Sequence, residues 1–339
     1  IKKKWIWRVF SKSCKRVMKN IQELGSIIEQ EIQAISYPTN PNLLYDPISY
    51  IMGLKGKRMR PILLLMAHQL FDENLETAIS PALAIEVFHN FTLLHDDIMD
   101  NAPLRRGNST VHEKWNSNVA ILSGDTMMIQ SYQLFAKVAE GSVKQVLEVF
   151  SKAAIEVCEG QQWDMDFETQ DDVEIADYLK MIEYKTAVLL AASLKIGAIT
   201  ANASVEDQNN LYEFGKNIGI AFQLKDDLLD AFGNPETFGK QVGGDILACK
   251  KTYLYLKALE VANVSQLEKL TDVYLDDHYP EEEKIENVKS LFEQMEIPMH
   301  TKNLMLAYQT KAMKHLESIS SENKAPLIAF SNKLMDRIS

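Results

Sequence analysis

The sequence predicts an all-α protein, and three features support this prediction. Apolar residues recur at spacings of three and four, the period of an amphipathic helix, most clearly over residues 76–97, 118–140 and 209–233. Alternation of apolar and polar residues never continues beyond four residues, and no Asn-Gly hairpin signal occurs, so strands are not expected. No Gly/Ser-rich or low-complexity segment divides the chain. We therefore expect residues 18–339 to form a single all-α domain.

The expected helix boundaries follow from proline and glycine. Pro81 fits the first turn of the first long helix, where its missing N–H costs nothing. Gly141 and Gly233 are expected to mark the ends of the second and third. From Lys251 onward the pattern predicts shorter amphipathic helices, separated at three prolines: Pro280, Pro298 and Pro326.

Composition narrows the function classes. The hydrophobic fraction of 46% and the charged fraction of 24% are those of an ordinary globular protein. A net charge of −11 argues against nucleic-acid binding. No uninterrupted apolar run approaches the roughly 18 residues of a membrane span, so no integral span is expected. The three cysteines, Cys14, Cys158 and Cys249, are far apart, which predicts neither disulfides nor a metal knuckle and suits a cytoplasmic location.

Residues 1–17 differ from the rest of the chain. They carry seven Lys or Arg and no acid, together with Trp5, Trp7 and Phe10. A basic amphipathic segment at a membrane surface is one interpretation. The other, which we prefer, is a non-native or disordered extension, with the protein proper starting at Met18.

Two copies of an Asp-Asp-x-x-Asp pattern lie 130 residues apart on apolar helical backgrounds: Asp96, Asp97 and Asp100, then Asp226, Asp227 and Asp230. The first and last acids of each copy share one helix face, with Cβ atoms about 5–6 Å apart, whereas the middle acid is rotated by about 100°. Like charges at this spacing destabilise a bare helix, so they need cations. One copy would be an ordinary solvated face, but two copies indicate a functional site.

Magnesium fits two such carboxylate faces, because it typically takes one or two carboxylates, several waters and substrate phosphates. The sequence lacks the His/Cys clusters of zinc sites. Basic residues follow or precede the acids in "LKGKRMRP", "PLRRGNSTVH" and "FGKQVGGDILACKKT". Each basic group alone would be a solvated surface, but beside the acidic helices they indicate diphosphate ligands.

With these motifs in place, the chain resembles the all-trans polyprenyl (isoprenyl) diphosphate synthases of the short-chain type. The likeness covers residues 45–260 and rests on "GKRMRP", "HNFTLLHDDIMDNAPLRRGNSTVH", "GQQWDMD", "YKTA", "FQLKDDLLD" and "GKQVGGD", in the family's order. The resemblance implies the isoprenoid synthase fold, a bundle of long helices around a deep central cavity, usually as a homodimer. It also implies Mg²⁺, with three ions per active site when substrate is bound.

The resemblance assigns roles residue by residue. The metal ligands would be the six aspartates, and the catalytic residues Asp96, Asp100, Asp226 and Lys185. The site for isopentenyl diphosphate would comprise Lys57, Arg60, His89 and Arg106. The allylic diphosphate would be held by Arg105, Lys185, Thr186, Gln223, Lys240 and Lys250. Gln161 and Asp164 match a further motif that faces the cavity.

Two positions depart from the family pattern. Lys55 replaces the first glycine of Gly-Gly-Lys-Arg, which would be a poor fit if this position needs a positive φ. Cys249 stands where glycine is common, and this weakens the assignment of Lys250.

Product length should depend on residues below the first acidic motif. Phe91, five positions before Asp96, lies about 7.5 Å down the helix axis. An aromatic residue there, with Thr92 rather than a second aromatic after it, resembles the geranylgeranyl class with its twenty-carbon product. Phe88 is a second candidate for the cavity floor, and ordinary core packing is the alternative for both phenylalanines.

The expected reaction is head-to-tail condensation by ionisation, condensation and elimination. The first alternative is a farnesyl diphosphate synthase. More remote alternatives are a class I terpene cyclase and an inactive partner of a heteromeric synthase. A class I terpene cyclase would carry an Asn/Ser/Glu metal motif in place of the second acidic motif. An inactive partner of a heteromeric synthase would show a decayed acidic motif, and both motifs are intact here.

Overall fold

The computed structural model describes residues 18–233, 242–276 and 278–335. Residues 1–17 and Lys240 lie outside the described residues. The α-helices are α1 (Ile21–Gln33), α2 (Asn42–Gly53), α3 (Met59–Gln69), α4 (Glu76–Met99), α5 (Val111–Lys114), α6 (Ser117–Phe135), α7 (Glu140–Thr169), α8 (Ile175–Ile182), α9 (Val188–Thr200), α10 (Val205–Phe232), α12 (Gly244–Leu247), α13 (Tyr253–Val261), α14 (Val264–Tyr274), α15 (Glu281–Gln294), α16 (Ile297–Glu317) and α17 (Ala325–Met335). A π-helical turn, η1 (Glu183–Ala187), joins α8 to α9, and two short strands, β1 (Leu104–Arg105) and β2 (Asn108–Ser109), follow α4. The predicted all-α fold is confirmed.

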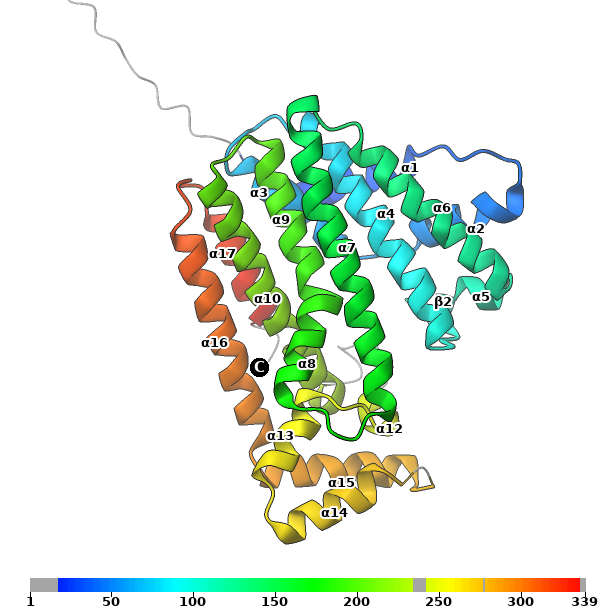
Figure 1. Cartoon of the computed structure of the whole chain (residues 1–339), viewed down its shortest axis with the longest axis vertical. Helices are drawn as coiled ribbons and strands as arrows, with labels where there is room; N and C mark the ends of the chain where they lie inside the picture. The colour runs from blue at the N-terminus through cyan, green and yellow to red at the C-terminus, as the bar shows by residue number, and fades with distance from the viewer. Residues whose placement is uncertain (1–17, 234–241, 277, 336–339) are drawn as a thin grey trace, which may run out of the picture.

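The long helices lie side by side in a bundle (Figure 1). Helices α4, α7, α9 and α10 run along its length, α16 flanks α10, and α14 and α15 lie across the lower end in this view. Helices α4, α7 and α10 all end toward that lower half. The segments that carry acidic residues near their carboxyl ends are therefore brought to one part of the molecule.

Helix α9 forms the centre of the bundle. It is apolar on all sides, and nearly every residue is buried, as expected for a helix enclosed by others. An ideal Cβ on Gly197 would lie only 2.1 Å from the carbonyl oxygen of Leu64 in α3. This glycine is therefore needed for the close packing of α3 on α9.

Two expected helix boundaries are wrong. Helix α4 begins at Glu76, so Pro81 lies inside it rather than in its first turn. Burial of the surrounding residues outweighs the loss of one helical hydrogen bond. Helix α6 already ends at Phe135, and Gly141 is the second residue of α7 instead of a stop signal.

The expected breaks in the C-terminal third are confirmed. Helix α15 begins directly after Pro280, and α16 and α17 each carry a proline as their second residue, Pro298 and Pro326. The N–H groups in the first turn of a helix have no acceptor within that helix. A proline in this turn therefore loses no hydrogen bond and is tolerated at little cost.

The absence of a hairpin was also predicted wrongly. Strands β1 and β2 pair in antiparallel register, with Arg105 opposite Asn108. The two residues between them, Arg106 and Gly107, have φ values of +53° and +76°. Two central residues with positive φ make the tight turn that suits a two-residue hairpin. Arginine at the first of these positions is unusual, so this turn has no recognisable signal in the sequence.

Helix α4 has the length and apolarity of a membrane span, with 24 residues and a mean hydropathy of 1.2 over its most apolar window. No uninterrupted apolar run had indicated a span, because polar residues interrupt the pattern. Within the bundle, 61% of that window is buried. Core helices of helical bundles can be equally long and apolar, and α4 packs as one of them.

Candidate active site

The first acidic motif lies at the carboxyl end of α4, where the hairpin folds back on it. Asp97 is only 1% exposed, and Nε and Nη2 of Arg105 reach its Oδ1 at 2.7 and 2.6 Å. Arg105 Nη2 also lies 3.4 Å from Asp96 Oδ2. Asp100 caps the helix and is exposed. Asp97, the middle acid of the motif, is thus buried and paired with Arg105.

Lys185 connects the first motif to α7. Its Nζ lies 2.5 Å from Asp164 Oδ2 and 3.6 Å from Asp96 Oδ1. Lys185 belongs to the π-helical turn η1, and such turns occur frequently at functional sites. An ideal Cβ on Gly160 would lie 2.2 Å from the backbone nitrogen of Lys185, so this glycine allows α7 to approach η1. Three segments distant in sequence therefore meet at one ammonium group.

The second acidic motif lies in the last turns of α10. Asp227, 5% exposed, accepts hydrogen bonds from the Tyr178 hydroxyl and from Gln223 Nε2, the latter at 3.0 Å. Asp230 Oδ2 accepts the backbone N–H of Asp245 at 2.9 Å. Asp226 is half-buried on the same helix. Asp227 is thus held by neutral donors, and Asp230 contacts the backbone of the segment that follows the helix.

A pocket of about 110 Å³ lies against the second motif. Its lining residues are Asp164, Phe167, Glu168, Tyr178, Met181, Ile182, Lys185, Thr186, Gln223, Asp227, Asp245, Lys250, Lys251 and Thr252. Lys185, Thr186, Gln223 and Lys250, assigned to the allylic diphosphate from the resemblance, are therefore brought together. Tyr178 and Asp245 were missed. Asp245 ends the "GKQVGGD" motif and so had a sequence signal, whereas nothing in the sequence marked Tyr178.

The electrostatics of this region are dominated by facing carboxylates. Burial lowers the pKa of Lys250, but Asp164, Asp245 and Asp100 more than offset it, and the net pKa is raised. Although part of the Asp100 side chain is open to solvent, partial desolvation and the neighbouring Asp96 raise its pKa. The region thus favours additional positive charge, and Lys250 remains protonated within it.

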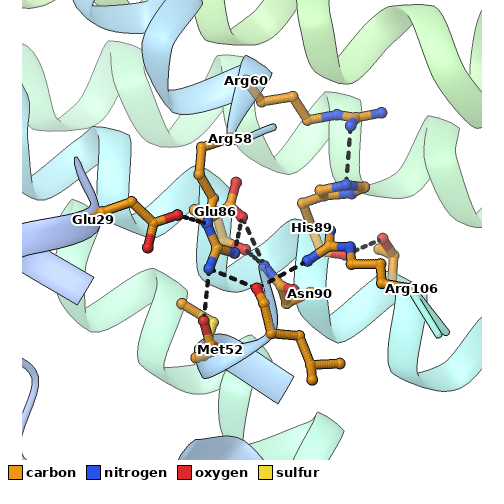
Figure 2. Close-up of polar contacts among 10 residues, drawn as sticks. Glu29, Met52, Arg58, Arg60, Glu86, His89, Asn90 and Arg106 are labelled. Carbon is orange, nitrogen blue, oxygen red and sulfur yellow. Dashed lines mark hydrogen bonds and ion pairs between the residues drawn. The ribbon is translucent and has the colours of Figure 1, made fainter. Parts of the chain in front are cut away.

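The basic loop before α3 forms a second cluster around a buried arginine (Figure 2). Arg58 is 4% exposed and pairs with Glu29 and Glu86, each at 2.8 Å. Its Nη2 also donates to the carbonyl oxygens of Met52 and Leu54 at 2.8 and 2.9 Å. With all these acceptors, Arg58 fixes the loop against α1, α2 and α4. The positive φ of +45° falls on Arg58.

Beside Arg58, two further guanidinium groups have few partners. Arg60 Nη1 lies 3.0 Å from His89 Nε2, and its buried Nε has no hydrogen-bond partner among the described residues. Burial and Arg106 lower the pKa of Arg60 to about 10, though Glu86 partly opposes this. Burial and Arg60 lower the pKa of His89 well below its ordinary value. Because a guanidinium only donates, His89 Nε2 accepts here, and its ring is neutral.

Arg106 reaches the same cluster from the hairpin. Its Nη1 lies 3.4 Å from the carbonyl oxygen of Leu54, and an ideal Cβ on Gly56 would be 2.7 Å from that Nη1. Gly56 therefore leaves room for Arg106. Lys57 is exposed at the edge of the cluster, as is Lys55, whose backbone does not require a positive φ. Arg60, His89 and Arg106 are thus brought together, while Lys57 points outward.

The residues expected to set product length lie along α4. Phe88 is fully buried and packs edge-to-face on Phe150, with centroids 5.0 Å apart. Phe91 is half-buried, and the centroid of its ring lies 5.6 Å from that of Phe88. The Thr92 hydroxyl donates to the carbonyl oxygen of His89 within the helix. None of these three lines the pocket beside the second motif.

With both aspartate faces and both basic clusters placed, comparisons with known proteins define the class. The polyprenyl synthetase family model matches residues 41–295. The chain belongs to the polyprenyl synthetase family.

Two curated relatives and one solved structure refine this result. A geranylgeranyl diphosphate synthase from Methanosarcina mazei is 41% identical over 72% of this chain and 76% of its own length. A geranylfarnesyl diphosphate synthase from Natronomonas pharaonis is 38% identical over 73% of this chain and 77% of its own. A crystal structure of geranylgeranyl pyrophosphate synthase has a TM-score of 0.91 at 47% identity, covering 95% of this chain and all of the other.

Proposed function

We propose that the chain is a short-chain trans-prenyltransferase that condenses isopentenyl diphosphate with an allylic diphosphate, giving geranylgeranyl diphosphate. The observation that carries this proposal is the pair Lys185 and Lys250, which lies among carboxylates from α4, α7 and the segment after α10. The relatives named above support the same reaction class.

The aspartates fit the proposed Mg²⁺. Asp96 Oδ1 is buried and lacks a hydrogen-bond partner among the described residues, because Lys185 at 3.6 Å is too distant. Within the same described ranges, no three His, Cys, Asp or Glu side chains converge into a complete metal site. Magnesium suits such an open set, since substrate phosphates and water complete its coordination. We propose the six aspartates as its ligands, with three ions per active site.

The chain's own cations would act on both diphosphates. Lys185, Lys250 and Arg105, with the polar Thr186 and Gln223, would bind the allylic diphosphate, and Lys240 is proposed to join them. The positive charge of Lys185, Lys250 and Arg105 would stabilise the negative charge that develops as the allylic C–O bond breaks. When bound, magnesium supplies further positive charge to the departing diphosphate.

The second basic cluster would hold isopentenyl diphosphate. Arg60 and Arg106 offer unused donors around the neutral His89, with Lys57 at the rim. The double bond of the bound substrate attacks the allylic cation and forms the new C–C bond. Loss of a proton, for which the departing diphosphate is the proposed acceptor, then gives the lengthened diphosphate and inorganic diphosphate.

The test is a direct assay. The purified chain is incubated with Mg²⁺, isopentenyl diphosphate and each allylic primer of five, ten or fifteen carbons, and the products are sized. A twenty-carbon product from each primer is expected. A fifteen-carbon end product would favour a farnesyl synthase, and a cyclised hydrocarbon a terpene cyclase. No product from any primer would favour an inactive partner subunit.

A twenty-five-carbon product is a second candidate, because the relative from Natronomonas pharaonis is named a geranylfarnesyl diphosphate synthase. Phe91 below the first motif supports the shorter product. Phe91→Ala should lengthen the product, and an unchanged spectrum would remove Phe91 from this role.

We also propose that the chain is a cytoplasmic homodimer. Helix α6 exposes Ile121, Leu122 and Ile129, an apolar surface that an isolated subunit would leave in water. Leu122→Glu should shift the species seen in analytical ultracentrifugation from dimer to monomer. Sedimentation of the unmodified chain as a monomer would contradict the dimer.

A further inference from the structure

Three rings follow one another along α4 at spacings of three and four residues: Phe88, Phe91 and His95. The centroids of Phe91 and His95 are 4.7 Å apart with an interplanar angle of 65°, an edge-to-face contact. Phe91 is half-buried and Phe88 fully buried. The imidazole is therefore the last ring of the row, next to the first acidic motif.

Helix α6 provides a seat for this imidazole. His95 Nε2 lies 3.3 Å from the carbonyl oxygen of Ile121, to which it donates. An ideal Cβ on Gly124 would lie 2.3 Å from Nε2 and 2.6 Å from Cδ2. Gly124 does not have a positive φ, so its backbone does not require glycine. Since glycine inside a helix costs about 1 kcal/mol relative to alanine, room for the His95 ring is its evident role here.

His95 precedes Asp96 directly but is turned to α6, where the carbonyl of Ile121 and Gly124 receive it. Among the described residues it makes no hydrogen bond or ion pair with an acidic side chain, and it is not one of the residues that line the pocket. What it does contact is Phe91, the residue expected to limit product length. A ring fixed on both sides, by Phe88 and by His95, has few rotamers open to it.

We propose that His95 is a specificity-determining positioning residue, which holds the Phe91 ring in place from its seat against Gly124 and so limits product length. This inference rests on the proposed function. Without the imidazole, the Phe91 ring can move into the vacated space, and a longer chain can be accommodated.

The test compares product lengths with the full chain and Mg²⁺. His95→Ala should raise the fraction of products beyond twenty carbons by about two- to tenfold, the range that one aromatic pair interaction corresponds to. His95→Phe, which keeps a ring beside Phe91, should stay near the unmodified profile. The KM for isopentenyl diphosphate should not change in either variant, because that site lies elsewhere.

Gly124→Ala tests the seat, since its methyl group must displace the imidazole. Its product profile should differ from that of the unmodified chain. Gly141→Ala is the matched control, because a Cβ there meets nothing within 4 Å, and it should leave the profile unchanged. Circular dichroism before each assay ensures that folded variants are compared.

A double variant separates positioning from an independent effect. In the Phe91→Ala background, His95→Ala should add no further lengthening, because the ring that it positions is gone. Additive lengthening, or an unchanged profile in both His95→Ala and Gly124→Ala, would overturn the inference while leaving the proposed function intact. No product from the unmodified chain would overturn the proposed function and this inference with it.

Discussion

The two acidic helix ends share one sequence pattern but are stabilised in different ways. At the end of α4, the buried Asp97 is paired with a charged arginine from the following hairpin. At the end of α10, the buried Asp227 is held by a tyrosine hydroxyl and a glutamine amide. In both motifs it is the middle acid that is buried.

The difference teaches how a buried carboxylate can be accommodated. Burial without a partner is costly, and both ends meet this cost with donors within hydrogen-bond reach. Arg105 lowers the pKa of Asp97, though burial still raises it overall. Burial and the nearby Asp245 raise the pKa of Asp227 well above its ordinary value, and among the described residues no cation donates a hydrogen bond to it. Asp97 thus keeps its charge more readily than Asp227.

The largest expected effect tests whether the two ends are equal in catalysis. Asp96→Ala and Asp226→Ala should each reduce turnover by about 10²–10³-fold, because each removes negative charge that the bound cations require. Helix content by circular dichroism should not change. Asp171→Ala, in the exposed segment between α7 and α8, is the control and should keep full turnover. Near-normal activity in either motif variant would refute the metal assignment at that end.

The next effect concerns the partners of the buried acids. Removing the cation from a buried pair typically costs 3–5 kcal/mol. We expect about 2–3 kcal/mol for Arg105→Met, because a quarter of the Arg105 side chain is exposed. Tyr178→Phe should cost about 1 kcal/mol, the net value of one hydrogen bond. Urea unfolding measures both, and a larger loss for Tyr178→Phe would reverse the comparison.

The third effect is the pH dependence of stability. Burial and Asp245 raise the pKa of Asp227 well above its ordinary value of 3.8. At a pH between the pKa of the unfolded chain and the raised pKa of the folded chain, Asp227 keeps a proton when folded and loses it when unfolded. The free energy of unfolding therefore falls as pH rises through this range. In the absence of Mg²⁺, Asp227→Asn should therefore stabilise the fold at neutral pH and flatten this decline.

Asp97→Asn provides the comparison for that measurement, because Arg105 partly compensates the burial of Asp97. Its effect on the slope of unfolding free energy against pH should be the smaller of the two. Thermal unfolding gives these slopes between about pH 4 and about pH 8, a range that begins near the ordinary carboxylate pKa. Equal slopes of the unfolding free energy in the two variants would show that the arginine makes no difference.

The smallest effect concerns the turns that follow the two motifs. After α4, positive φ values fall on Asn101, Arg106 and Gly107, and among the described residues between α10 and α13 they fall on Gly243 and Cys249. Cys249 has a φ of +51°, in the left-handed region that glycine adopts without strain. Cys249→Gly should be about 1 kcal/mol more stable than Cys249→Ala, because both lack the thiol and only alanine strains the backbone. Equal melting temperatures would mean that this turn stores no strain.

Much of the candidate site was predictable because its residues form local patterns. Asp96 and Asp100 lie four residues apart on one helix, and the arginines follow them directly. The roles of Lys185 and Lys250 came only from the resemblance, since a single lysine carries no periodic signal. Tyr178 could not be found in this way, because its partner Asp227 is 49 positions away.

The sequence by itself determined the helical class, the two aspartate faces and the family to which the chain belongs, because helix period and short motifs are local properties. Only the tertiary structure decided which acid of each motif is buried and which side chain satisfies it. It also decided that Arg58 fixes the basic loop while Arg60 keeps unused donors, and that His95 turns to Gly124. These choices depend on contacts between helices distant in the chain, and such contacts are made only when the bundle packs.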